Sequence, residues 1–129
     1  KNMYFDLLTK IKNAQAVERE NIKIPYNNMD FVVAELLAEH RFIQSIEKKG
    51  RMPKRIMEIK LKYGQDGNGA VQGVRFLSKP SREIYAGYKE IKPVRQGYGL
   101  LAISTSKGIM DGKKAKKLKL GGQLLFEIW

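Results

Sequence analysis

Hydroxyl side chains, a cation and a glycine occur together in one short segment, Ser104-Thr105-Ser106-Lys107-Gly108. Small hydroxyl side chains can reach the base edges and ribose 2′-hydroxyls in the wide, shallow minor groove of A-form RNA. A glycine lets the backbone approach a ligand closely. The segment therefore predicts a finger that binds nucleic acid. The alternative is a turn whose hydroxyls cap backbone groups, which is the commoner role of such clusters.

Lysines crowd the short segment that follows. They are Lys113, Lys114, Lys116, Lys117 and Lys119. Like charges this close on a helix repel one another unless an anionic partner supplies counter-charge, so Lys113 and Lys116 are predicted to contact RNA. The alternative is a solvated helix face. A membrane surface fits poorly, because only Ala115 and Leu118 offer apolar groups for insertion.

A third candidate segment combines positive charge with an aromatic ring. Lys79, Pro80, Ser81 and Arg82 form a predicted loop, and Tyr85 follows it in a predicted strand. The cations suit phosphate, and the ring could stack on an unpaired base or ribose. The alternative for Tyr85 is a place in the core.

The composition supports an anionic partner and gives no support for an enzyme. The chain has 129 residues, with 25 Lys+Arg against 13 Asp+Glu, and 25 − 13 gives a net charge of +12. Nucleic acid, an acidic membrane and an acidic protein all remain open as partners. The chain has no cysteine and one histidine, His40, so we expect no metal site and no cofactor. The acids are scattered, and no set of titratable groups predicts catalysis. A soluble intracellular protein is expected, because no apolar run approaches the roughly 20 residues of a membrane span.

Hydrophobic periodicity predicts a mixed α+β fold. In the first half it indicates a helix over 4–14, a strand over 21–25, a helix capped by Asn27, and strands over 42–48 and 55–63. In the second half it indicates extended segments over 71–77, around residue 84 and over 100–104. A short helix over 113–119, capped by Asp111 and ended by Gly121-Gly122, is expected next, before a last strand over 124–128.

A glycine-rich stretch over 64–69 punctuates the chain and predicts two small α/β domains, residues 1–70 and residues 71–129. The first would be built as helix, strand, helix and strands, and the second mostly of strands with one short helix. Residues 1–70 carry 13 basic and 9 acidic side chains, a net charge of +4, whereas residues 71–129 carry 12 and 4, a net charge of +8. The second domain is therefore the better candidate for binding an anionic partner.

Several of these motifs, in order and at compatible spacing, resemble one known family, the eighth protein of the small ribosomal subunit in its bacterial form. The N-terminal ones are Leu8-Thr9-Lys10-Ile11-Lys12-Asn13-Ala14, Ile24-Pro25, Phe42-Ile43 and Lys60-Leu61-Lys62-Tyr63. The C-terminal ones are Ser78-Lys79-Pro80, Tyr85, Gly97-Tyr98-Gly99, Ser104-Thr105-Ser106-Lys107-Gly108, Ala115, Gly121-Gly122 and the extended end at Trp129.

The resemblance implies a protein of the ribosome, cytoplasmic or organellar, that binds the central domain of small-subunit rRNA and supports subunit assembly. It implies an RNA-binding loop of Ser104, Thr105, Ser106 and Gly108, flanked by Tyr85 and the loop over 79–81. Gly122 and Gln123 join this predicted RNA-binding set. Neighbouring small-subunit proteins are further implied partners, and repression of its own operon mRNA is an open alternative. No membrane partner is implied.

The chain departs from the family pattern at three positions: Gln123 replaces a glutamate, Glu83 replaces a basic residue, and Arg41 replaces the glycine that usually follows the second helix.

Two other functions stay open beside the ribosomal one. The lysine-rich helix could bind an acidic protein or a membrane. An RNA-modifying enzyme is the least supported function, because the sequence offers no candidate nucleophile, metal site or cofactor loop for it.

Overall fold

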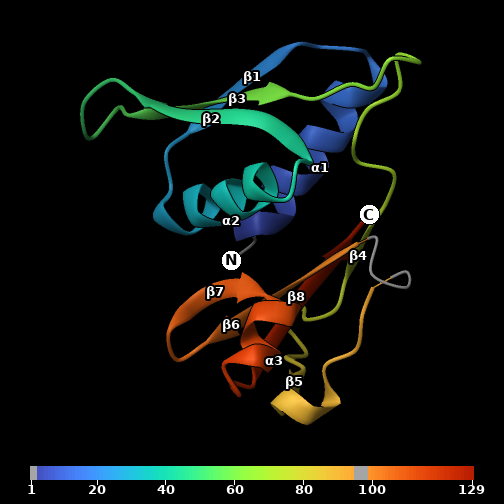
Figure 1. Ribbon diagram of the computed structural model, residues 1–129. Helices are drawn as coiled ribbons and strands as arrows, with labels where there is room; N and C mark the ends of the chain where they lie inside the picture. Colours follow the sequence, from blue (N-terminus) through green and yellow to red (C-terminus); the bar gives the residue numbers. More distant parts are fainter. Residues whose placement is uncertain (1–2, 95–98) are drawn as a thin grey trace. The chain divides into compact units, whose positions relative to one another are not determined.

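The computed structural model of the chain describes residues 3–94 and 99–129, and it divides into two compact units. One unit ends at Val71, and the other begins at Gln72. Each unit has its own antiparallel sheet and at least one helix (Figure 1). This two-part α+β architecture confirms the predicted fold class.

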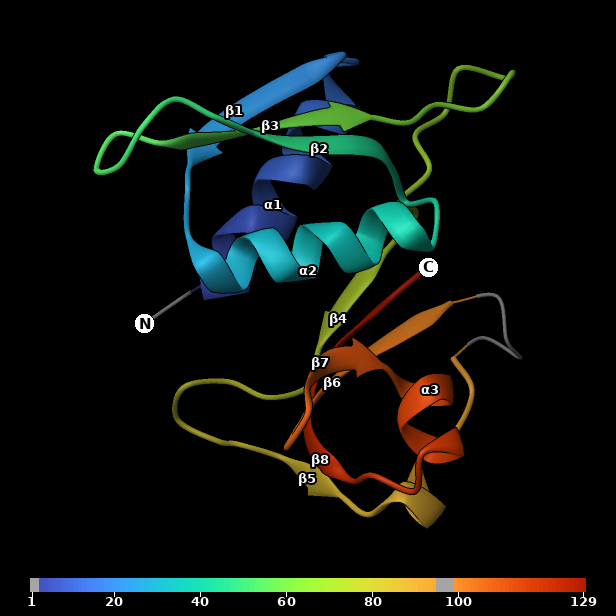
Figure 2. The same cartoon turned by 60° about the vertical axis from the view of Figure 1, so that its left-hand side comes forward.

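The N-terminal unit places two helices against a three-stranded sheet. Its elements are α1 (Met3–Ala16), β1 (Asn21–Pro25), α2 (Asn28–Glu39), β2 (Ile43–Lys49) and β3 (Ile56–Leu61). The strand order is β1-β3-β2, which leaves β1 at one edge. Both helices lie on the same side of the sheet (Figure 2).

Local patterns explain these elements. Ile22 and Ile24 are buried on β1 while the residues between and beside them are exposed, which is the alternation of a strand with one buried face. The N-cap of α2 is Asn27, whose Oδ1 accepts hydrogen bonds from the backbone N–H groups of Met29 and Asp30, at 2.9 and 3.2 Å. The core side chains of α2 are Val33, Ala34, Leu36 and Leu37.

The C-terminal end of α2 adopts a left-handed cap although the residue there is an arginine. Arg41 has a φ of 65°. Its N–H donates to the Ala38 carbonyl at 3.1 Å, and the Phe42 N–H donates to the Leu37 carbonyl at 2.9 Å. This pair of hydrogen bonds satisfies the last carbonyls of the helix in the manner of a Schellman motif. The arrangement that glycine would favour is therefore retained at a cost in backbone strain.

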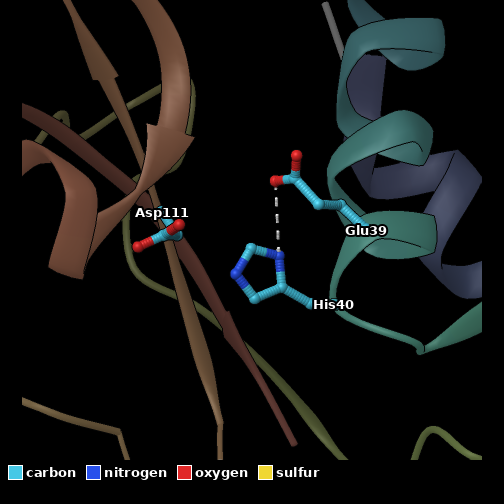
Figure 3. Close-up of side chains that lie close together, drawn as sticks. All are labelled: Glu39, His40 and Asp111. Carbon is cyan, nitrogen blue, oxygen red and sulfur yellow. Dashed lines mark ion pairs between the residues drawn. The ribbon is translucent and has the colours of Figure 1, made fainter.

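His40 also lies at this end of α2. Its Nδ1 is 3.0 Å from the Leu36 carbonyl oxygen and 3.9 Å from the Glu39 carboxylate (Figure 3). An imidazole proton on Nδ1 is therefore directed at one of the last carbonyls of the helix.

The C-terminal unit is built around one strand that pairs with three others. Its elements are β4 (Val74–Phe76), β5 (Tyr85–Ala86), the short 3-10 helix η1 (Tyr88–Glu90), β6 (Leu100–Thr105), β7 (Gly108–Asp111), α3 (Gly112–Lys117) and β8 (Gly122–Ile128). The strand order is β4-β8-β6-β7, and β5 pairs with the start of β8. One buried hydrophobic cluster comprises Ile91, Val94, Leu101, Ile103, Met110 and Ala115, and Phe126 and Ile128 of β8 are also fully buried.

Two predictions about this unit are wrong. The predicted order, in which the short helix comes next after the extended segment over 100–104, omits β7, which lies between them and pairs with β6 as a hairpin. The helix is shorter than predicted, and it is ended by Lys119, which has a φ of 61°, instead of by the glycine pair. The Leu120 N–H donates to the Ala115 carbonyl there, at 2.8 Å. Gly97 and Tyr98 of the predicted glycine loop lie outside the described residues.

Candidate nucleic-acid interface

The sheet of the C-terminal unit brings together residues from three separate predicted segments. Tyr85 on β5 lies opposite Gln123 on β8, and Gln123 also lies opposite Ser104 on β6. Directly opposed residues of antiparallel strands project from the same face of a sheet. An aromatic ring, an amide and a hydroxyl therefore form one row, which we call the Tyr85 row.

Glycines allow the three strands to approach each other. A Cβ atom on Gly122 would collide with the carbonyl oxygen of Ser104, and one on Gly121 would lie 2.6 Å from that of Ala86. Both positions therefore require the absence of a side chain. Contrary to the prediction, the glycine pair does not end α3. It allows β8 to lie close to β5 and β6. Two successive glycines before a strand were the only sequence signal for this role.

The hydroxyls of the β6–β7 hairpin have different tasks. The Thr105 Oγ1 donates to the Gly108 carbonyl at 2.9 Å and accepts from the Lys107 N–H at 3.1 Å. Thr105 therefore follows the alternative of a turn that caps backbone groups. Gly108 has a φ of 111°, a conformation that favours glycine.

Ser106 and Lys107 are exposed at the tip of this hairpin. Within the described residues, the Ser106 hydroxyl has no hydrogen-bond partner, so its donor and acceptor sites are available to a ligand. The hairpin thus divides its roles: Thr105 holds the turn, whereas Ser106 and Lys107 are the groups that can reach a partner.

The loop over 79–82 is a tight turn with two cations. The backbones of Lys79 and Arg82 exchange two hydrogen bonds, both at 2.9 Å. Ser78 beneath them is 1% exposed, and its Oγ accepts from the Ile84 N–H at 2.9 Å. Lys79, Pro80, Ser81 and Arg82 are all exposed, so the two charges project from a short turn anchored by a buried hydroxyl. No pattern in the sequence indicates this anchoring role of Ser78.

Tyr85 belongs to the surface. Its side chain is 65% exposed, so the core alternative is wrong. The phenol donates a hydrogen bond to the Glu83 carboxylate at 3.2 Å. That hydrogen bond, together with the charge of the same carboxylate, raises the pKa of the Tyr85 phenol. Glu83 also places a negative charge beside the row, which would weaken the attraction of a phosphate there.

The lysine-rich helix α3 presents its charges unequally. Its N-cap is Asp111 as predicted, with Oδ1 accepting from the Lys114 N–H at 2.8 Å. Ala115 is buried. The Lys116 Nζ donates to the Ile91 carbonyl at 3.0 Å and so ties the helix to the segment after η1. Lys113 is exposed and has no ion pair within the described part of the chain. Lys113 is therefore the better phosphate ligand, and Lys116 has a structural task as well.

The helices of the described residues include none that is long and apolar enough to cross a membrane.

Comparison with known proteins gives matches over nearly the whole chain. The family model for ribosomal protein S8 matches residues 3–129. The small ribosomal subunit protein uS8 of Caldicellulosiruptor bescii is 41% identical over 124 residues, which cover 96% of this chain and 94% of that protein. The proteins of the same name from Clostridioides difficile and Sorangium cellulosum are 39% and 38% identical, again over 96% of this chain and over 94% and 95% of their own lengths. The chain therefore belongs to the ribosomal protein S8 family.

Proposed function

We propose that this protein is a structural constituent of the small ribosomal subunit, not an enzyme, and that it binds the central domain of small-subunit rRNA through its C-terminal unit. The observation that carries the proposal is the Tyr85 row, in which Tyr85, Gln123 and Ser104 share one face of the sheet. These uncharged groups can form hydrogen bonds with base edges and ribose hydroxyls, and the ring can stack on a base. Such contacts can distinguish one RNA from another, whereas contacts of cations with phosphates cannot.

Cations near these segments supply the complementary, sequence-independent part of binding. Lys79 and Arg82 project from the tight turn before β5, Lys107 lies at the hairpin tip, and Lys113 lies on α3. Contacts between such side chains and phosphates release counterions and so contribute affinity that falls as salt rises. The combination of salt-dependent contacts with an uncharged row is what a specific RNA-binding protein requires.

The relatives support a role in the ribosome beyond RNA binding itself. The relatives are named as small ribosomal subunit proteins, and we propose that this chain has the same place, next to neighbouring small-subunit proteins, and supports subunit assembly. An rRNA-like hairpin in its own operon mRNA would present the same chemistry and is a second candidate ligand of this surface.

Binding of the purified protein to a central-domain rRNA fragment and to a scrambled duplex of equal length, measured across a salt series, tests the proposal. We expect the fragment to bind more tightly by a factor that persists as salt rises, because part of the recognition is uncharged. If both RNAs bound with equal affinity and both were released as the salt concentration rises, specific recognition would be contradicted. The protein would then be a general polyanion-binding protein.

A pair of matched variants locates the recognition. Gln123→Ala removes the amide at the centre of the row without changing charge, and we expect it to lower the preference for the fragment by about 1 to 3 kcal/mol. Gln72→Ala removes the same amide from an exposed position of the same unit that lies outside the row. An equal effect of the two variants would show that the row is not the recognition surface.

A further inference from the structure

A pocket of about 330 Å³ opens on the N-terminal unit between the second half of α1 and the edge strand β1. Its volume falls at the lower end of the range, about 300 to 1,000 Å³, that sites for small organic ligands occupy. None of the residues predicted to bind RNA lies in this unit, so the pocket shares no residue with the Tyr85 row.

One part of the pocket is apolar. Ala14 and Ile22 form a buried part of its wall, and Val17, directly after α1, is 69% exposed. An exposed valine beside a hollow leaves apolar surface in contact with water, which a flat, weakly polar group would cover favourably. The planar face of a nucleobase is such a group.

The rest of the pocket is positively charged. Lys10 of α1, Arg19 of the following turn and Lys23 of β1 line it, and all three are exposed. No carboxylate is among the lining residues of the pocket. Lys23 alternates with the buried Ile22 and Ile24, so its side chain projects from the opposite face of β1. Lys10 and Arg19 remain as two cations without a lining acid, which favours an anionic ligand such as a phosphate group.

Hydrogen-bonding groups are also available at the pocket. Asn13 lines it with an exposed amide, which can both donate and accept. The backbone of β1 contributes more. The Leu61 N–H donates to the Glu20 carbonyl, and the Tyr26 N–H donates to the Arg55 carbonyl. The even-numbered residues of β1 therefore direct their backbone N–H and C=O groups towards β3. Lys23 therefore directs its own N–H and C=O towards the open edge.

We propose that this pocket binds one unpaired ribonucleotide of the RNA partner, with the base against Ala14, Val17 and Ile22 and the phosphate between Lys10 and Arg19. The inference rests on the RNA-binding function proposed above and extends it to the N-terminal unit. An unpaired nucleotide fits because its base can be turned out of the stack, whereas paired bases cannot enter a pocket on the protein surface.

Adenosine 5′-monophosphate is a suitable probe, because an asparagine amide can donate to and accept from the edge of adenine. In NMR titrations of the full-length labelled protein, we expect saturable shifts at the backbone amides of 13–17 and 22–24. Inorganic phosphate should bind at least about fivefold more weakly there, since it lacks the base. Identical saturation by phosphate would reduce the pocket to an anion site and overturn the proposal, as would the absence of shifts in this region.

Matched variants separate the pocket from general charge. Lys10→Gln should weaken nucleotide binding roughly two- to fivefold, the effect of one charge contact at a water-exposed site. Lys12→Gln removes the same charge from an exposed position of the same helix that does not line the pocket, and should leave the affinity unchanged. Equal losses in both would overturn the assignment. A glutamate-rich peptide that shifts these amides when the nucleotide does not would also overturn it, in favour of a protein partner.

Failure of this inference can be told apart from failure of the proposed function. If the protein prefers the central-domain fragment but the nucleotide does not shift the pocket amides, only the pocket assignment is wrong. If the nucleotide binds but the fragment is not preferred, the function proposed for the Tyr85 row is wrong.

Discussion

Gly122 lies so close to Ser104 that a Cβ atom on the glycine would overlap the serine carbonyl oxygen. The close approach joins β8 to β6 at the point where the Tyr85 row crosses both strands. A residue with no side chain therefore sets the spacing of the residues that we propose to bind RNA.

Gly122→Ala should destabilise the C-terminal unit by about 2 to 3 kcal/mol, because backbone on the opposite side cannot move aside without disrupting the β6–β8 pairing. Urea unfolding measures the loss, and binding to the central-domain fragment should fall with it. Gly87→Ala is the control, since a Cβ there would lie 3.5 Å from the nearest atom, the Glu90 Oε1. Equal stability of the two variants would contradict the role assigned to Gly122.

Substitutions at the two hairpin hydroxyls should have different effects. Thr105→Ala removes the two hydrogen bonds that hold the turn and should lower the free energy of unfolding by about 1 kcal/mol. Ser106→Ala should leave unfolding unchanged but reduce the preference for the central-domain fragment over the scrambled duplex, by about 1 kcal/mol for each hydrogen bond that the hydroxyl makes to the RNA. Thermal unfolding and competition binding, measured on both variants, separate the two roles. If Thr105→Ala reduced the RNA preference and left the stability unchanged, the structural role assigned to Thr105 would be wrong.

The two lysines predicted to contact RNA should also differ. Lys113→Ala should lower the slope of log K against log salt by about 1 without changing stability, because its charge faces solvent. Lys116→Ala should reduce stability by about 1 kcal/mol, since it removes the Nζ hydrogen bond to the Ile91 carbonyl. A salt series and urea unfolding provide both quantities. If Lys116→Ala unfolds like the parent protein, the bond to Ile91 contributes nothing measurable.

The N-terminal unit could be predicted well because its patterns are local. The alternation of Ile22 and Ile24 indicates the strand over 21–25, and Asn27 marks the start of α2, where the structure has both. By contrast, the sequence does not predict β7. Its four residues are too few to show a clear alternation, and the strand is defined by its pairing with β6, from Ala102 opposite Asp111 to Thr105 opposite Gly108.

The candidate site was predictable by residue type but not by arrangement. Hydroxyls, lysines and family resemblance identified Ser104, Tyr85 and Gln123, whereas their common row depends on strand register, which the sequence does not show. The Lys116 bond to Ile91 spans 25 residues and has no local signal. The pocket between α1 and β1 is unpredictable for a related reason, because Lys10 is an ordinary exposed residue of an amphipathic helix until β1 is placed beside it.

Replacing Arg41 with glycine should stabilise the N-terminal unit. Arg41 has a φ of 65°, which is unfavourable for a residue with a side chain, and the cap at this position needs that conformation. The gain should be about 0.5 to 1 kcal/mol in urea unfolding, because glycine also loses more entropy on folding. Arg41→Ala is the control: it keeps the strain and should not stabilise. A similar gain in both variants would attribute the effect to the arginine side chain instead of the backbone.

Asp30 should make the stability of the N-terminal unit depend on pH in the direction opposite to most carboxylates. Burial, together with the nearby charge of Asp6, raises the pKa of Asp30 from 3.8 to about 6, although Lys10 acts in the other direction. Its Oδ1 is buried, with no hydrogen-bond partner among the described residues. The folded state therefore favours the protonated acid. The resulting stabilisation is complete below about pH 4 and is lost as the pH rises through 6.

Asp30→Asn removes this titration, so we expect the variant to be more stable than the parent at pH 8, with the difference shrinking towards pH 5. The full shift corresponds to about 3 kcal/mol, but Asp30 is only half-buried, and solvent screening should reduce the effect to about 1 kcal/mol. Urea unfolding of both proteins at pH 5, 6, 7 and 8 provides the comparison. Asp66→Asn is the control, because Asp66 is an exposed carboxylate in the loop after β3. Parallel pH profiles for the parent and Asp30→Asn would show that the carboxylate ionises without cost in the folded protein, and that α1 and α2 do not hold it in a desolvated site.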